Sequence, residues 1–565
     1  MSMDDYTSDL DINNEGIPTA SKLRKLLKPY KVVRDPIHGD IKLTRLETAI
    51  IDTRGFQRLR TIEQLGPSSQ VYPGAVHNRF EHSIGTLWDA QNMFDKINQN
   101  GNEYPNLYFP LDEYTRLLTR LFALVHDVAH IPFGHTLEDE GNNFPSQWED
   151  ESRIEHFLGN ESEIGKKIKE YAGIKTLEKL REIVLAKKED EIKKLEFPIV
   201  ADIVANTICA DLLDYVERDL YYSGLKGGYD KRFLEYLTAQ KIDDSNKLRL
   251  VMPLFKTEKE GYRRDVVSEI LLLLRLRYSI SEKIYYHHAK IAASAMIIEA
   301  VNIALQGNKN WLMKDIFSIG DQELLHKLEL EDESPVGTKF IANHYRNRSL
   351  YKPIYLVSYK QVSTGDKSSL VKDEKTNELA KNPLQRYDLA RKLERNSFLP
   401  EGSIIIYCPP KGMGRKIAEA KVGWGDKIHL LKDVKHYDIG KQTEEIVKRH
   451  EELWTLQVFI SPKYYEMPQV RNVVIDFYTE TGLEQELKKF DLKEMISLPP
   501  HEKVVYSFLN KQDKKTKEKI TPDIIQSMLQ IANTPSPNQK EPKILADNEL
   551  QNVFGKLMND HNRND

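Results

Sequence analysis

Apolar residues recur at helical spacing over most of residues 31–310, and this pattern constrains the fold more than any other feature of the sequence. One stripe consists of Ile84, Leu87, Trp88, Phe94 and Ile97. A wider stripe over residues 117–125 predicts a buried helix. Charged surface helices are expected over 162–195, and longer helices with mixed faces over 198–221 and 264–306. The spacing therefore predicts a mainly α-helical core.

The pattern changes in the C-terminal part of the chain. Four short segments favour strands, namely GSIIIYCP at 402–409, KIHLL at 427–431, WTLQVFI at 454–460 and NVVIDFY at 472–478. A flexible loop or linker is expected at 360–383. The Lys-rich stretch 511–519 and the segment TPSPNQKEP at 534–542 favour a tail.

These shifts divide the chain into four predicted parts. They are a polar N-terminal arm over 1–30, an all-helical core over 31–320, a smaller α+β lobe over 321–500 and a polar Lys-rich tail over 501–565. The fold class that we predict is mainly α, with an α+β C-terminal lobe.

The composition excludes several classes of protein. Hydrophobic residues make up 40% and charged residues 30% of the 565 residues, which argues against global disorder. The 82 basic and 86 acidic residues nearly balance, so nucleic-acid binding is only the weaker alternative, confined to the basic tail. Two distant cysteines, Cys209 and Cys408, exclude a disulfide scaffold and favour a cytoplasmic protein. The densest apolar run, ILLLL at 270–274, is too short to span a membrane.

Histidines are concentrated in one part of the sequence. Five of the sixteen lie between residues 77 and 135: His77, His82, His126, His130 and His135. The pair His126-Asp127 follows the predicted buried helix, and His130 lies four residues after His126, on the same helical face. Both histidines point away from the leucine stripe, which suits a cavity.

Two further residues complete a candidate metal site. His82 lies opposite the apolar stripe of its helix, and Asp211 lies on a polar strip with Asp214 and Arg218 of an otherwise apolar helix. Buried carboxylates are costly without a partner, and a metal ion is one such partner. A single histidine is more often structural, and Asp214 with Arg218 could be a simple helix ion pair. The whole set predicts a metal site better than any member does. Its mixed ligands suit Mn, Fe, Zn, Ni or Mg.

Longer segments around these residues resemble one family. They are DPIHGDIKL at 35–43, IIDTRGFQRLRTIEQLG at 50–66, VYPGAVHNRFEHSIGT at 71–86, LVHDVAHIPFGH at 124–135 and DLLDYVERDLYYSG at 211–224. The chain resembles the HD-domain dNTP triphosphohydrolases, in particular the branch with sterile-alpha-motif/HD-domain enzymes and their bacterial relatives. The resemblance covers about residues 31–310 and is weaker over 385–465.

The resemblance implies roles for the residues at the candidate site. The implied metal ligands are His82, His126, Asp127 and Asp211. The implied catalytic residues are His130 and His135, which face the phosphates, with Asp214 or Asp150 as a carboxylate partner. Asp150 stands where the family has a histidine.

A second group of residues is implied to contact the substrate. Its members are Gln64, Arg79, Tyr215, Asp219, Arg277, Tyr285 and His288. Guanidinium groups suit phosphate, which fits Arg79 and Arg277. Tyr285 follows Arg277 by eight residues, about 80° round one helix, and the matching family tyrosine packs where a 2′-hydroxyl would lie. Leu212 and His288 stand where the family has lysines, which reduces the positive charge.

A third group concerns regulation. Lys31, Asp52, Gln57 and Arg60 match positions where family members bind an activating guanine nucleotide, GTP or dGTP, between subunits. The alternative is that Asp52 and Arg60 form structural ion pairs. The resemblance also implies a homo-oligomer, either a dimer or a tetramer.

The function implied by the resemblance is metal-dependent hydrolysis of deoxynucleoside triphosphates to deoxynucleoside and tripolyphosphate. One alternative keeps the metal site but acts on single-stranded nucleic acid or a cyclic nucleotide, as a phosphodiesterase or nuclease. Leu212 and the basic tail favour that alternative, whereas Tyr285 and Gln64 oppose it. The other alternative is a non-catalytic nucleotide sensor, which the complete metal set opposes.

Overall fold

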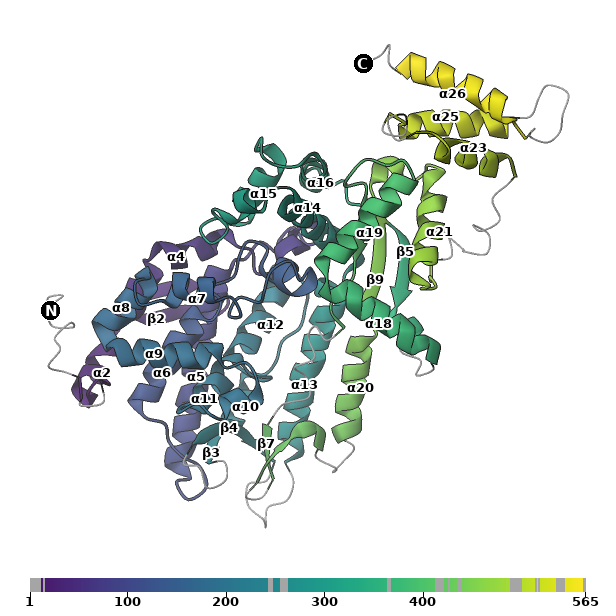
Figure 1. The fold of residues 1–565 in the computed structure, drawn as a ribbon. Helices are drawn as coiled ribbons and strands as arrows, with labels where there is room; N and C mark the ends of the chain where they lie inside the picture. The colour runs from purple at the N-terminus through teal and green to yellow at the C-terminus, as the bar shows by residue number, and fades with distance from the viewer. Residues whose placement is uncertain are drawn as a thin grey trace.

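The computed structural model describes residues 12–13, 16–241, 247–254, 263–362, 367–411, 421–424, 427–433, 439–487, 500–513, 516, 519–534 and 544–561. Most of the predicted N-terminal arm before residue 16, and residues 535–543 of the predicted tail, lie outside these ranges. The fold is mainly α-helical with a few small sheets (Figure 1). The predicted fold class is therefore confirmed.

The N-terminal part opens with a hairpin and continues as a helical bundle. Its elements are α2 (Ala20–Leu26), β1 (Pro29–Asp35), β2 (Gly39–Thr44), α3 (Arg45–Ile51), α4 (Arg54–Gln57), η2 (Arg58–Thr61), η3 (Gly66–Gln70), α5 (Arg79–Glu103), α6 (Glu113–Val125), η4 (Thr136–Glu140), α7 (Glu151–Leu158), α8 (Glu163–Ala172), α9 (Ile174–Leu185), α10 (Glu189–Ile192), α11 (Pro198–Ala205) and α12 (Ala210–Tyr222). Strands β1 and β2 pair antiparallel.

Helices α5, α6 and α12 form the centre of this bundle. Asn78 caps the N-terminus of α5 and Asp112 caps that of α6, each accepting a backbone N–H with its side chain. The leucine stripe of α6 is buried, as its spacing predicts. Because α5 packs against both α6 and α12, polar residues on the facing sides of these helices are brought together in the interior.

A second group of elements follows. It comprises η5 (Lys231–Tyr236), β3 (Thr238–Lys241), β4 (Leu248–Pro253), α13 (Arg264–Ile280), η6 (Ser281–Tyr285), α14 (His288–Met313), α15 (Asp321–Leu330), α16 (Val336–Arg346), β5 (Lys352–Ser358), α17 (Tyr359–Val362), α18 (Lys367–Lys381), α19 (Pro383–Asn396), β6 (Ile404–Tyr407), β7 (Lys421–Trp424), β8 (Lys427–Leu430), η8 (Leu431–Asp433), α20 (Ile439–Glu451), β9 (Thr455–Ile460), η9 (Pro462–Tyr464) and α21 (Gln469–Thr481).

Elements from residues 321–500 pack directly against elements from residues 31–320. Strands β5, β9 and β6 form an antiparallel sheet in that order, which packs with α14 in a second hydrophobic cluster. Strands β7 and β8 instead join β3 and β4 in one sheet, and α20 lies beside α13 (Figure 1). Packing is therefore continuous across residue 320, and the boundary proposed there stays a prediction.

Helix α14 is long and apolar enough to cross a membrane by length and composition. In the structure, however, 83% of its apolar window is buried inside the protein. It is the only such helix among the described residues, and it forms the core of the second cluster.

Three sequence expectations differ from the structure. The predicted strand NVVIDFY lies within helix α21, where Val470, Val473, Val474 and Phe477 are buried at helical spacing. The predicted loop at 360–383 contains helix α18. The prediction also missed β1 to β4, which are short strands inside a region of helical periodicity.

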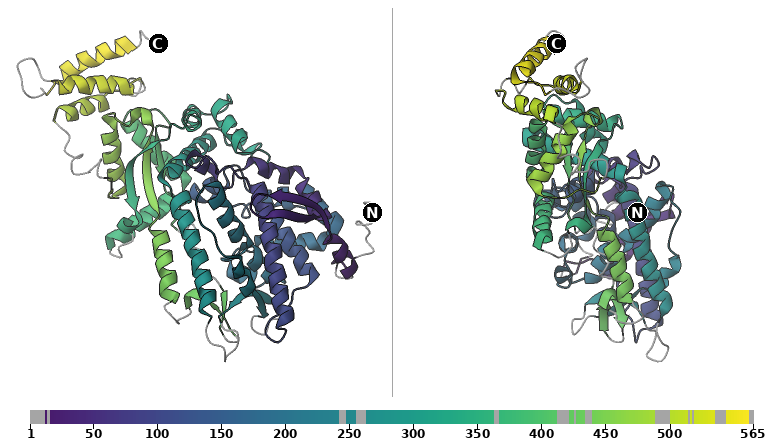
Figure 2. Two further views of the ribbon diagram at one scale, coloured as in Figure 1. Left: turned by 180° about the vertical axis from the view of Figure 1, so that it is seen from behind. Right: turned by 90° about the vertical axis from the view of Figure 1, so that its right-hand side faces the viewer.

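The segment expected as a polar tail contains three helices. Among the described residues of this segment they are α23 (Pro500–Asn510), α25 (Pro522–Asn533) and α26 (Asp547–His561), and they stand at the end of the molecule opposite α2 (Figures 1 and 2). Their apolar faces form a small separate cluster that includes Phe398 of the lobe. The high Lys content of 511–519 hid this amphipathic pattern.

Candidate metal centre and active site

Four predicted metal ligands come together in the interior. His82 lies on α5, His126 is the C-cap of α6, Asp127 follows it, and Asp211 lies on α12. Nε2 of His82 is 3.2 Å from Nε2 of His126 and 3.1 Å from Oδ1 of Asp211. Ligand atoms of His82, His126 and Asp127 all lie within 4.8 Å of one another. The first three side chains are buried and that of Asp211 is 35% exposed, so the site opens on its side.

The donor set suits a divalent metal ion. His126 donates from Nδ1 to the carbonyl of Ala123 at 2.8 Å, and His82 donates from Nδ1 to Asp214 at 2.7 Å. These hydrogen bonds leave both Nε2 atoms as the metal-binding ends of their rings. Two facing imidazole nitrogens beside two carboxylates repel unless a cation lies between them. Burial alone would lower the pKa of His82, but hydrogen bonds to Asp211 and Asp214 raise it to about 10.

Asp214 lies behind the metal site and is fully buried. Its carboxylate accepts hydrogen bonds from His82, from Nε2 of His38 at 2.7 Å, and from Arg218 at 2.8 and 2.9 Å. Arg218 is buried too and also pairs with Asp35 at 3.0 Å. Although burial alone would raise it, Arg218 and the two histidines hold the pKa of Asp214 well below its usual range. Asp214 thus orients His82, one of the four predicted metal ligands.

Gly85 on α5 leaves space for this arrangement. An alanine Cβ there would lie 1.9 Å from Oδ1 of Asp214 and 2.4 Å from a guanidinium nitrogen of Arg218. We therefore expect Gly85→Ala to destabilise the protein by about 1–3 kcal/mol and to weaken metal binding, which thermal unfolding and metal titration would measure. Gly555 in α26 has no atom near its Cβ position, so Gly555→Ala should be neutral or slightly stabilising. Equal effects of the two changes would contradict this account.

His130 is buried beside the metal ligands, with Nε2 3.4 Å from Oδ1 of Asp127. Its Nδ1 lies 3.0 Å from Oε2 of Glu138, and Glu138 in turn accepts from Arg153 at 2.9 Å. The carboxylate partner of His130 is therefore Glu138, in place of the expected Asp214 or Asp150. Asp150 caps helix α7, where its carboxylate accepts from the backbone and hydroxyl of Ser152.

His135 lies beside His130, with their ring centroids 4.6 Å apart. Its side chain is half exposed, and its Nδ1 lies 2.6 Å from Oδ2 of Asp139 in η4. Burial opposes protonation, but the Asp139 carboxylate raises the pKa of His135 above its ordinary value. This residue can therefore carry a proton at neutral pH on the open side of the site.

The segment that includes these histidines, residues 128–141, is held by many groups on its far side from the metal site. Phe133 and Gly134 have positive φ values of 58° and 31°. Arg58 donates to the carbonyls of Val128 and His130. The other contacts come from later parts of the chain, from Asp321 to the N–H of Phe133, from Lys290 and Tyr407 to Glu140, and from Arg386 to the carbonyl of Gly141.

Arg79 is buried and donates to Asp127 at 2.5 Å. Its guanidinium therefore lies at the metal site, beside the backbone of Gly134. Burial alone would raise the pKa of Asp127, but the charges of His126 and Arg79 hold this pKa well below its usual range. The side-chain carbonyl of Gln64 is buried and makes no hydrogen bond to another described residue.

Several residues that were predicted to contact the substrate lie close to one another around Asp219 and Tyr285. The hydroxyl of Tyr285 donates to Asp219 at 2.6 Å, and His77 lies 2.9 Å from the other oxygen of Asp219. Tyr215 and Arg277 lie close enough to influence the Tyr285 hydroxyl. Helix α13 ends at Ile280, and Tyr285 is the last residue of the π-helical turn η6, so Arg277 and Tyr285 do not share one α-helix.

His288 and Leu212 occupy different environments. His288 is exposed at the start of α14 and stacks on His287 at 4.4 Å. Leu212 is buried in the main hydrophobic cluster. Neither residue supplies the fixed positive charge of a lysine.

The predicted activator residues pair with one another on the surface. Nζ of Lys31 is 3.9 Å from Asp52, and both side chains are more than half exposed. Arg60 donates to Gln57 at 2.9 Å and lies over the ring of Phe80. Asp52 thus forms an ion pair, whereas Arg60 bonds a neutral amide, and the activator role stays a prediction.

Several residues that lie around the histidines of the site were not predicted from the sequence. Glu138, Asp139, Arg153 and His38 make contacts at short range around the histidines. The spacing of Asp139, four residues after His135, is a signal that the sequence did contain. Arg153 and His38 reach the site only through tertiary packing.

Comparisons with known proteins agree with this geometry. The model of the HD domain matches residues 79–219, and that of the HD associated region matches residues 267–470. An uncharacterized protein of Methanocaldococcus jannaschii is 32% identical over 351 residues, which cover 61% of this chain and 64% of the relative.

Two named relatives are also similar. The deoxynucleoside triphosphate triphosphohydrolase SAMHD1 of Homo sapiens is 29% identical over 362 residues, covering 56% of this chain and 54% of that protein. The SAMHD1 homolog of Dictyostelium discoideum is 28% identical over 334 residues, which cover 58% of this chain and 60% of that protein. The chain spans less than two thirds of the length of each relative. The chain therefore contains an HD domain over residues 79–219, followed by an HD associated region over residues 267–470.

Proposed function

We propose that this protein is a metal-dependent triphosphohydrolase that converts deoxynucleoside triphosphates to deoxynucleoside and tripolyphosphate. The observation that carries the proposal is the convergence of His82, His126, Asp127 and Asp211 beside two histidines that each have a carboxylate partner. The similarity to SAMHD1, named as a deoxynucleoside triphosphate triphosphohydrolase, supports the substrate class.

In this mechanism His82, His126, Asp127 and Asp211 would hold the metal ion, and the other site residues would bind the triphosphate and protonate the leaving 5′-oxygen. The chemistry that a divalent ion supplies at such a site is polarisation of a phosphoryl oxygen and a lower pKa for a water molecule. Attack of water on the α-phosphorus forms one P–O bond and breaks the bond to the 5′-oxygen, which needs a proton. Arg277 would stabilise charge on the phosphates. Arg79 would hold Asp127 and contribute its positive charge.

His135 is the best-placed proton donor for the 5′-oxygen, because Asp139 favours its protonated form. His130, held by Glu138, is buried next to Asp127 and would position the α-phosphate. Tyr285, fixed by Asp219, would pack against the sugar and disfavour a 2′-hydroxyl.

Asp139→Asn should alter the pH dependence of hydrolysis. A raised pKa means that His135 is protonated below that value and loses its proton as the pH rises through it. Without the Asp139 charge this loss occurs at lower pH, so the alkaline limb of kcat moves to lower pH and kcat near pH 8 falls by about tenfold. Asp139→Glu should restore the profile. An unchanged alkaline limb in Asp139→Asn would exclude this role for His135.

Three finer statements remain part of the proposal. We propose GTP or dGTP activation at Lys31, Asp52, Gln57 and Arg60. Tyr30 and Val32, which flank Lys31 on β1, expose apolar side chains that suit a subunit contact, so we propose a dimer or tetramer. We also propose a cytoplasmic location, in keeping with the two cysteines Cys209 and Cys408, which are buried and form no disulfide.

The decisive experiment is incubation of the purified protein with Mn²⁺ and each of the four dNTPs, singly and mixed, followed by chromatography. Deoxynucleoside and tripolyphosphate are the expected products. Turnover only in mixtures or with added GTP would support the activator site. If metal-loaded protein instead releases nucleotides from single-stranded DNA, RNA or cyclic nucleotides, the phosphodiesterase alternative replaces this proposal.

A further inference from the structure

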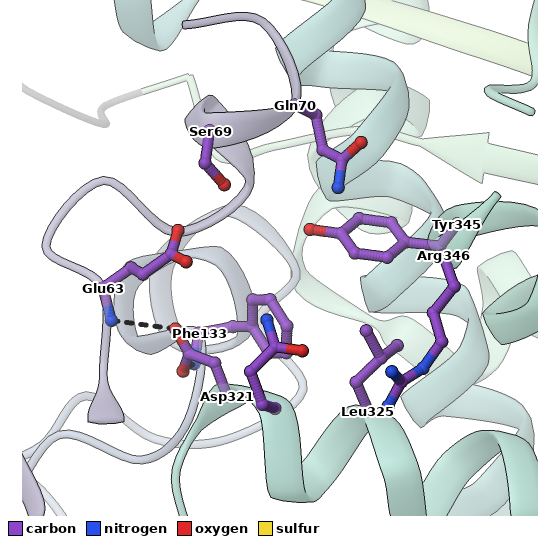
Figure 3. A pocket seen from close by; sticks show the side chains of 9 residues that line it. Glu63, Ser69, Gln70, Phe133, Asp321, Leu325, Tyr345 and Arg346 are labelled. Atoms are coloured by element: carbon purple, nitrogen blue, oxygen red, sulfur yellow. Dashed lines mark hydrogen bonds between the residues drawn. The ribbon is translucent and has the colours of Figure 1, made fainter. Parts of the chain in front are cut away.

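A pocket of about 190 Å³ lies behind the segment that carries His130 and His135. It is bounded by Ser69 and Gln70 of η3, by Phe133, by Asp321 and Leu325 of α15, and by Tyr345 of α16 (Figure 3). Glu63, Gln322 and Arg346 complete its lining. The carboxylate of Glu63 and the hydroxyl of Tyr345 point into it from opposite sides.

Two carboxyl groups, those of Glu63 and Asp321, line the pocket, and the nearby charges of Arg79 and Arg58 act to lower the pKa of Asp321. Among the described residues, neither Glu63 nor Asp321 has a lysine, arginine or histidine within ion-pair distance. Arg346 points away and pairs with Glu329 at 2.6 Å, whereas Arg58 donates to backbone carbonyls. Burial and the Asp321 charge raise the pKa of Glu63 to about 7, and burial raises that of Asp321 to about 6. Both acids therefore reach full charge only at slightly alkaline pH.

The other walls suit an organic cation better than a bare metal ion. The rings of Phe133 and Tyr345 lie 6.3 Å apart and nearly perpendicular, beside Leu325. These rings and Leu325 offer an apolar surface to a short carbon chain, and the oxygens of Ser69, Gln70 and Gln322 can accept N–H hydrogen bonds. The volume equals that of about six water molecules, more than a directly coordinated ion needs.

We propose that this pocket binds a small aliphatic amine, its ammonium group between Glu63 and Asp321 and its carbon chain against Phe133 and Tyr345. Asp321 already joins the pocket to the active site, because it accepts the N–H of Phe133 at 2.7 Å and that of Glu63 at 2.9 Å. The occupant thereby stabilises the positive-φ turn between His130 and His135. Gln64 follows Glu63 directly, so the same occupant affects a predicted substrate contact. Amine binding does not depend on the proposed hydrolysis.

The test is calorimetric titration of the full-length protein with 1,4-diaminobutane at about pH 8, without nucleotide. We expect submillimolar affinity, weakened about tenfold or more by Glu63→Gln and unchanged by Glu333→Gln, which removes an exposed carboxylate. Affinity should also fall at about pH 5.5, where Glu63 and Asp321 gain protons. Tyr345→Phe keeps the ring and should retain binding, whereas Tyr345→Leu should not. Bound amine should slow hydrogen exchange over residues 131–135.

Three outcomes would overturn the proposal. They are no binding by the wild-type protein at millimolar amine, equal affinity of wild type and Glu63→Gln, or preferential binding of Mg²⁺ or Ca²⁺ that Glu63→Gln abolishes. The last outcome would assign the pocket to a metal ion. The titration measures amine binding without nucleotide. Its result can therefore be interpreted even if the protein does not hydrolyse deoxynucleoside triphosphates.

Discussion

Replacing Asp211 with alanine is expected to remove bound divalent metal and to lower dNTP turnover by at least about a thousandfold. Asp211 supplies one of the two carboxylates that face the Nε2 atoms of His82 and His126. Its side chain is 35% exposed, more than that of any other ligand, so its removal disturbs the fold least. Metal content by mass spectrometry and steady-state hydrolysis would measure the two effects.

The matched control is Asp190→Ala, which removes an exposed carboxylate from α10. It should keep both the metal content and the turnover of the wild-type protein. Full activity of Asp211→Ala with normal metal content would show that the three remaining ligands suffice, and the four-ligand site would be wrong.

Replacing Arg218 with methionine is expected to destabilise the protein by about 3–5 kcal/mol. Arg218 is fully buried between Asp214 and Asp35, and removing its charge leaves two buried carboxylates without their cation. Asp214 would then hold His82 less firmly, so metal affinity should fall together with the free energy of unfolding. Urea unfolding and metal titration would measure these two quantities.

Arg34→Met offers a contrast on the protein surface. Arg34 and Asp40 also lie 2.9 Å apart, but their side chains are 77% and 64% exposed. Water already solvates both charges, so the loss should be below about 1 kcal/mol. Similar losses from the two replacements would mean that burial does not set the strength of the Arg218 interactions.

The helical core could be predicted because its apolar spacing is regular over long segments. Helix α6 illustrates this, since its leucines are buried as their spacing requires. The segment NVVIDFY misled the prediction because valine, isoleucine and aromatic residues favour strands in general. In the structure, packing of Val473, Val474 and Phe477 against the lobe determines the helix α21.

The same contrast holds at the site. His82, His126, Asp127 and Asp211 were named from the sequence, and the structure brings them together. The partners of the histidines were harder to predict, because hydrogen bonds depend on distances of a few tenths of an ångström. Asp150 was assigned to the site by its sequence position, yet its carboxylate is engaged in capping α7.

The contacts behind residues 130–141 have a consequence for how this protein can be divided. Asp321, Tyr407 and Arg386 belong to the C-terminal lobe, yet all three hold the segment that bears His130 and His135. A fragment ending after α12 would contain all four metal ligands and both histidines but none of these supports. We therefore expect this fragment to bind the metal ion but not to hydrolyse the proposed substrate. Any domain exchange or grafting that involves this protein must therefore carry both regions together.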